Sequence, residues 1–187
     1  MEKKHVPSQD ILPGRVMYLD FDVTSVRCVQ SFNKIYLMAA FLPYSRYLYG
    51  VFFNEPLTSE SLTELLDDCF THIGGVPEEL EFDKERLSTV TKSGKSIWAT
   101  GTFRRFAWDR GFILKLNQKG ITHFMKTVKS NFAERTIYME DWIWDESFAD
   151  WLRDINNKPR RLNTKVVPTQ RLELEQPFLQ PLYGYID

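Results

Sequence analysis

The chain has 187 residues and a mass of 22.1 kDa, which suits a single domain with or without an appended segment. Hydrophobic residues make up 43% and charged residues 26%, with a formal net charge of −1, so the composition excludes a disordered, collagen-like or coiled-coil chain. No apolar run approaches the ~18 residues of a membrane span, and we expect no contact with a membrane. Two cysteines, Cys28 and Cys69, are too few for a disulfide framework, which favours a cytoplasmic protein.

The first third of the chain has the composition of β-strands. Runs rich in β-branched and aromatic residues predict strands at 16–23, 26–32, 34–42 and 46–53. Pro43 lies between the last two runs, and the sequence leaves open whether they form one bent strand or two.

The remaining chain alternates between helices and strands. Helical spacing of apolar side chains predicts helices at 58–73, 101–110, 119–133 and 145–156. Short strands are expected at 80–82 and 112–116. We expect residues 84–100 to be the least ordered stretch, and we predict no regular structure from Lys158 onward.

This order of elements predicts the fold class. Early hairpins imply antiparallel pairing, and later helical connections imply parallel pairing. The expected fold is therefore α/β, with a mixed five-stranded sheet flanked by helices as in ribonuclease H-like domains, although many α/β folds share such an order. We divide the chain into an N-terminal tail at 1–12, a core at 13–135 and a helical and irregular C-terminal extension at 136–187.

Charge is unevenly distributed along the chain. Acidic residues dominate 55–85, whereas basic residues dominate 104–135 and 158–171. A basic second half suggests a polyanion such as DNA as the partner, while the alternative is a set of ordinary solvated faces. The candidate phosphate-binding residues are Arg104, Arg105, Arg110, Lys119, Lys126 and Lys129.

Three carboxylates stand out because of their positions relative to predicted strands. Asp20 and Asp22 are two residues apart on the first strand, so they point to the same face of the sheet. Asp83 follows another strand, at the edge where α/β sheets place ligand sites. Two acids meeting at neighbouring strand ends suit Mg²⁺, which prefers oxygen ligands. The alternative is that such an Asp caps a helix or a turn.

Four blocks of sequence also support a family resemblance. They are Pro13-Gly14 with YLDFD at 18–22, Pro43-Tyr44-Ser45-Arg46, Gly74-Gly75-Val76-Pro77 with LEFDKE at 80–85, and a C-terminal group of Trp151-Leu152, Asn156-Asn157, Pro168-Thr169 and LEQPFLQPL at 174–182. In this order they resemble the catalytic region of IstA-type transposases, the DDE integrases of certain bacterial insertion sequences.

The resemblance implies a ribonuclease H-like integrase core that cleaves and transfers DNA strands with Mg²⁺ or Mn²⁺. Asp20 and Asp83 correspond to metal ligands of a two-cation site, and Asp22 lies outside the family's catalytic pattern. DNA is the implied partner. The resemblance leaves open whether the chain forms a homo-oligomer and whether it needs an ATPase helper protein.

The third catalytic carboxylate of that family is missing. Its glutamate lies on a helix after a Lys-Gly pair, and aligning on Lys119-Gly120 puts His123 at that position. Aligning on the apolar stripe of the helix puts Thr122 there instead, and we favour this register because a residue beside the sheet should flank the stripe. Neither side chain is a carboxylate. Two hypotheses follow, namely a weakened catalytic core and a non-catalytic DNA- or protein-binding module that retains the fold.

Overall fold

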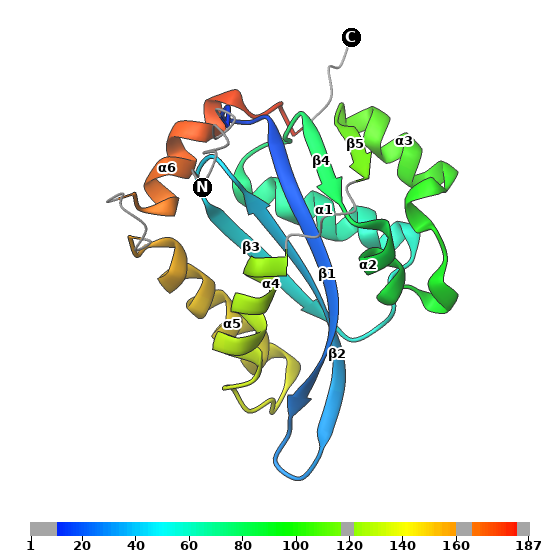
Figure 1. Cartoon of the computed structure of the whole chain (residues 1–187), viewed down its shortest axis with the longest axis vertical. Coiled ribbons are helices and arrows are strands. Elements are labelled where there is room, and N and C mark those ends of the chain that lie inside the picture. The colour runs from blue at the N-terminus through cyan, green and yellow to red at the C-terminus, as the bar shows by residue number, and fades with distance from the viewer. Residues whose placement is uncertain (1–10, 117–121, 160–165, 183–187) are drawn as a thin grey trace, which may run out of the picture.

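The computed structural model describes residues 11–116, 122–159 and 166–182. A five-stranded sheet with the order β3-β2-β1-β4-β5 forms the centre of this part (Figure 1). The strands are β1 (Val16–Arg27), β2 (Phe32–Leu42), β3 (Tyr47–Phe53), β4 (Glu79–Phe82) and β5 (Ile113–Leu116). β1, β2 and β3 pair antiparallel, whereas β4 pairs parallel with both β1 and β5. The predicted mixed sheet is confirmed, and Pro43 separates two strands.

Helices cover both faces of the sheet (Figure 1). The α-helices are α1 (Ser59–Ile73), α2 (Lys84–Thr89), α3 (Gly101–Arg110), α4 (Thr122–Val128), α5 (Asp141–Asn156) and α6 (Pro168–Glu175). Short helical turns are η1 (Lys92–Gly94), η2 (Ile97–Ala99), η3 (Lys129–Ala133, of π type) and η4 (Gln176–Phe178). In the described part of the chain, none of the helices has the length and apolar character needed to span a bilayer.

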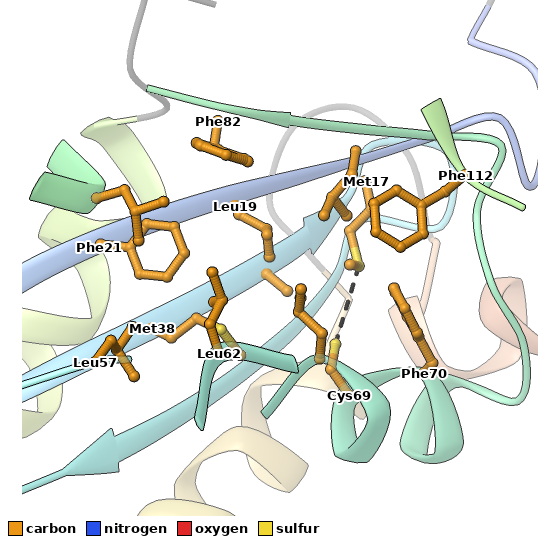
Figure 2. Close-up of a cluster of buried hydrophobic side chains, with 14 of the residues drawn as sticks. Met17, Leu19, Phe21, Met38, Leu57, Leu62, Cys69, Phe70, Phe82 and Phe112 are labelled. Carbon is orange, nitrogen blue, oxygen red and sulfur yellow. Dashed lines mark hydrogen bonds between the residues drawn. The ribbon is translucent and has the colours of Figure 1, made fainter. Parts of the chain in front are cut away.

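Two apolar clusters hold the layers together. On one face, β1 contributes Met17, Leu19 and Phe21, which pack against α1 and α3. Figure 2 shows this cluster, in which Cys69 of α1 lies against Met17 with 3.9 Å between the two sulfur atoms. The cluster on the other face joins β2 and β3 to α4, η3 and α5. β1 is therefore covered on both sides, and any polar group in its middle must be satisfied locally.

The sequence of α1 explains why this helix was predictable. Thr58 and Ser61 form a reciprocal capping box, in which each side chain accepts a hydrogen bond from the other's backbone N–H. Gly74 ends the helix with φ of 89°, a left-handed conformation that favours glycine.

Three local predictions are wrong. Residues 26–32 are not a separate strand, because β1 continues to Arg27 and turns through Cys28 to Ser31 into β2. The turn contains Val29, an exposed β-branched residue that gave no turn signal. The stretch 84–100 contains α2, η1 and η2, which are too short to show helical periodicity. The region after Lys158 contains α6, which starts with Pro168 at a position that favours proline.

Candidate active site

The site is built on one face of β1. Alternation along the strand puts Asp20 and Asp22 on the face opposite Leu19 and Phe21. Asp20 is only 1% exposed, and Asp22 is partly exposed. The sequence suggested that Asp20 lies at the end of its strand. In the structure β1 continues beyond Asp20 for seven more residues, to Arg27. Asp20 lies instead at the level where the neighbouring strand β4 ends.

The pairing of β1 with β4 brings the two predicted metal ligands next to each other. The last paired residues are Leu19 of β1 and Phe82 of β4. One residue further along each parallel strand come Asp20 and Asp83, on backbones that lie roughly 5 Å apart in a sheet. The structure therefore brings together two acids that are far apart in the sequence.

Asp83 also has the structural role that we considered as its alternative. It is the N-cap of α2, and its Oδ1 accepts hydrogen bonds from the backbone N–H groups of Glu85 at 2.8 Å and Arg86 at 3.4 Å. The cap explains why a short helix begins immediately after β4. It also fixes the direction in which the Asp83 carboxylate points.

Two basic side chains complete the cluster, and sequence reasoning missed their role. Arg86 donates from Nε to Asp20 Oδ1 at 2.5 Å and from Nη2 to Asp22 Oδ2 at 3.4 Å. Lys129 of η3 donates to Asp22 Oδ2 at 3.0 Å. Arg86 carried a weak signal, since it lies one helical turn after a strand-end aspartate. Lys129 was identified only as a DNA-binding candidate.

The environment of Asp20 bears on whether it could hold a cation. Burial raises the pKa of Asp20, although the charge and hydrogen bond of Arg86 oppose this shift. Its Oδ1 accepts from Arg86 and from the backbone of Phe21, whereas its Oδ2 is buried without a hydrogen-bond partner among the residues that the structure describes. A buried carboxylate oxygen in this state is a suitable ligand for a cation.

The described residues supply only part of a metal shell. Within 11–116, 122–159 and 166–182, no three His, Cys, Asp or Glu residues gather closely enough to enclose an ion. Asp20 and Asp83 therefore fit a Mg²⁺ or Mn²⁺ ion that keeps several water or phosphate ligands, as Mg²⁺ usually does. They do not fit a cation held by protein atoms alone.

The position predicted for the third catalytic residue falls at the start of α4. Thr122 is the first residue of this helix, but the side chains of Thr122 and His123 lie outside the described part of the chain.

The candidate DNA-binding residues lie in two different layers. Lys126 of α4 is exposed on the layer that faces the carboxylates, and Lys129 of η3 is partly exposed on the same layer. Arg104 and Arg105 are exposed on α3, which packs on the opposite face of the sheet. The remaining two candidates differ. Arg110 donates to Asp67 of α1 at 2.8 and 2.7 Å, and Lys119 lies outside the described residues.

A polar groove of about 470 Å³ continues the carboxylate face towards the start of β1. Tyr18, two residues before Asp20, lines it together with Glu79 and Glu81 of β4. Burial and these two glutamates raise the pKa of Tyr18. Lys115 of β5 lies 2.5 Å from Glu79. The acids of this face would repel a phosphodiester unless cations offset their charge.

Comparison with known proteins relates the chain to transposases. It is 26% identical to the transposase for an IS21-like insertion sequence element of Bacteroides fragilis over 81% of the chain, and 27% identical to a putative transposase for element IS5376 of Geobacillus stearothermophilus over 98% of the chain. The transposase for element IS21 of Pseudomonas aeruginosa is 25% identical over 88% of the chain. The chain spans 31%, 48% and 43% of the lengths of these three relatives, which is less than half in each case. No protein-family model matches it.

A solved structure supports the fold. A chain in the structure of the simian T-cell lymphotropic virus intasome in complex with the PP2A regulatory subunit B56 gamma has a TM-score of 0.61. The match covers 92% of this chain and 58% of that chain at 13% sequence identity, a level at which the likeness bears on the fold alone. The expected ribonuclease H-like α/β fold and the resemblance to insertion-sequence transposases are both confirmed.

Proposed function

We propose, starting from this chain's relationship to insertion-sequence transposases, that it is the core region of such a transposase and acts on DNA. The reaction class is metal-dependent cleavage and transfer of DNA strands, at a rate lowered by the missing third carboxylate. The observation that carries the proposal is the β1–β4 register, which brings Asp20 alongside Asp83 at the end of β4.

In this proposal each residue of the site has a defined task. Asp20 and Asp83 would hold Mg²⁺ or Mn²⁺, which would supply activation of a water or a DNA 3′-hydroxyl and stabilisation of the leaving oxygen. Asp83 is oriented by its cap on α2, and Asp20 is held by the hydrogen bonds to its Oδ1. Lys126 and Lys129 contribute positive charge on the same layer, where it offsets repulsion between the acids and DNA phosphates.

A second candidate function is a DNA- or protein-binding module without catalysis. The ion pairs of Arg86 with Asp20 and of Lys129 with Asp22 favour it, because they neutralise the carboxylates without a metal. The lack of a carboxylate at both 122 and 123 favours it as well.

A plasmid-nicking assay with Mn²⁺, run beside a DNA gel-shift assay, separates the two candidates. We expect the wild-type chain to nick DNA slowly. Asp20→Asn and Asp83→Asn should each lower nicking by at least about 100-fold, while DNA binding stays within about 3-fold. Nicking that survives both substitutions would refute the site. Undetectable wild-type nicking combined with unchanged DNA binding would instead support the non-catalytic module.

The same assay tests the position of the third carboxylate. Thr122→Glu should raise nicking, since the apolar stripe of the helix favours position 122 for the missing glutamate and an added anionic ligand strengthens cation binding. His123→Glu is the matched control and should leave the rate unchanged. A gain with His123→Glu alone would show that the other register is correct.

A further inference from the structure

Arg86 contacts all three acids of the site. Its backbone N–H donates to Asp83 Oδ1 at 3.4 Å, its Nε to Asp20 Oδ1 at 2.5 Å and its Nη2 to Asp22 Oδ2 at 3.4 Å. The residue belongs to the first turn of α2, which Asp83 itself caps. The same aspartate that marks the end of β4 therefore also positions the guanidinium between the two acids of β1.

The charges of the two acids on β1 are already balanced by basic side chains. Asp20 and Asp22 carry two negative charges, and Arg86 and Lys129 carry two positive charges at ion-pair distance from them. A divalent cation added to this arrangement would lie a few ångströms from the guanidinium and would be repelled by it. Because Arg86 holds one of the two oxygens of Asp20, a cation would reach only the unpartnered Oδ2 while Arg86 stays in place.

The guanidinium can leave this position without disrupting the core. The Arg86 side chain is 28% exposed, so it lies at the boundary with solvent, whereas Asp20 is 1% exposed. The apolar residue that anchors α2 to the core is Leu87, which points into the cluster around β1 and α1. Rotation of the Arg86 side chain towards water therefore leaves the packing of α2 unchanged.

We propose that Arg86 is a built-in counter-ion that holds Asp20 and Asp22 until a divalent cation takes its place. A cation at Asp20 binds against the charge of the guanidinium, and reaches both oxygens of Asp20 only if the guanidinium withdraws, so Arg86 lowers the affinity of the site for Mg²⁺ and Mn²⁺. This inference rests on the proposed role of Asp20 as a metal ligand. It adds that, when no metal is bound, Arg86 stabilises the site by pairing with Asp20 and Asp22.

Calorimetric titration of the whole chain with Mn²⁺ tests the competition directly. We expect Arg86→Met to bind Mn²⁺ at least about 10-fold more tightly than the wild type. Lys129→Met removes the same charge from Asp22 without freeing an oxygen of Asp20, so its gain should stay below about 3-fold. Arg153→Met, at an exposed position of α5, is the control for loss of a distant charge and should match the wild type. Adding Asp20→Asn to Arg86→Met should abolish the gain.

Thermal unfolding provides a second measurement. In EDTA, Arg86→Met should melt at a lower temperature than the wild type, because Asp20 loses its partner, and Mn²⁺ should raise its melting temperature by more than it raises that of the wild type. If Arg86→Met does not fold, the same measurements are made on Arg86→Gln, which keeps a hydrogen-bond donor but not the charge.

Equal or weaker Mn²⁺ binding by both Arg86 variants would overturn the inference, as would an equal gain with Lys129→Met. This result is distinct from failure of the proposed function. If Arg86→Met binds Mn²⁺ more tightly but the chain never nicks DNA, the role of Arg86 as counter-ion stands and the catalytic proposal is refuted. If the wild type nicks DNA slowly but Arg86→Met binds Mn²⁺ no more tightly than the wild type, the catalytic proposal stands and the role of Arg86 as counter-ion is refuted.

Discussion

Asp20 illustrates how a single buried charge depends on its neighbours. A carboxylate in the middle of a covered strand is costly unless it is paired, and here it is satisfied by a backbone N–H and by a guanidinium from α2. The pairing leaves its second oxygen without a partner in the described structure. This combination distinguishes Asp20 from Asp83, whose Oδ1 is engaged in capping a helix.

His72 gives a pH-dependent prediction at the same scale. Part of its side chain is exposed, but the ring packs against Tyr47 and Tyr49, and its Nε2 lies 2.9 Å from the Tyr47 hydroxyl. This partial burial lowers the pKa of His72 below its ordinary value. The unfolded chain therefore takes up a proton first, and the free energy of unfolding should fall as the pH drops below about 6.5.

Urea unfolding of the wild type and of His72→Gln, compared between about pH 7.5 and about pH 5.5, measures this effect. The substitution should reduce the dependence on pH, because glutamine can hydrogen-bond to Tyr47 but does not titrate. The prediction fails if the two proteins lose stability in parallel.

At the scale of elements, α5 fastens the open edge of the sheet. β3 is an edge strand, and Asn156 at the end of α5 pairs with both backbone groups of Leu48. The Leu48 N–H donates to Asn156 Oδ1 at 3.0 Å, and Asn156 Nδ2 donates to the Leu48 carbonyl at 2.7 Å. The amide thus imitates one pair of the missing neighbouring strand.

Asn156→Ala should destabilise the chain by about 2–3 kcal/mol, because it leaves two backbone groups of a buried residue unsatisfied. The adjacent exposed residue provides the control, and Asn157→Ala should cost less than about 0.5 kcal/mol. Both values come from chemical denaturation. Equal losses in the two variants would show that the Asn156 clamp contributes little.

Elements differed in how well the sequence predicted them, and the difference follows from length and capping. α1 has a capping box, an apolar stripe and a terminal glycine, three signals that agree. α2 has only six residues and is specified by the Asp83 cap rather than by periodicity. The β1–β2 turn contains Val29, whose strand propensity points away from a turn.

At the scale of the whole molecule, segments far apart in sequence meet at one end of the sheet. The fully buried carboxylate of Glu175 in α6 accepts hydrogen bonds from the backbone N–H groups of Gly14, before β1, and Ser45, between β2 and β3. α6 thereby ties the C-terminal region to the strands that carry the site. The division of the chain at residue 135 stays a prediction, although α5 and α6 both pack on the sheet.

Long-range contacts mark the limit of what the sequence could predict about the site. Asp20 and Asp83 were identifiable, because Asp20 lies on a predicted strand, Asp83 directly follows one, and both stand in sequence blocks that resemble the transposase family. Their partners were not, because Arg86 and Lys129 reach β1 from residues 64 and 107 positions beyond Asp22. No local pattern encodes such a contact, and it follows only from the assembled sheet and helices.

The account depends most on a cation site shared by Asp20 and Asp83. Anomalous diffraction from crystals soaked in Mn²⁺, for the wild type and for Asp83→Asn, measures this directly. We predict a manganese peak bounded by the two carboxylates in the wild type, with Arg86 turned away from Asp20, and no peak in Asp83→Asn. Manganese bound elsewhere, or a peak that persists in Asp83→Asn, would contradict the account.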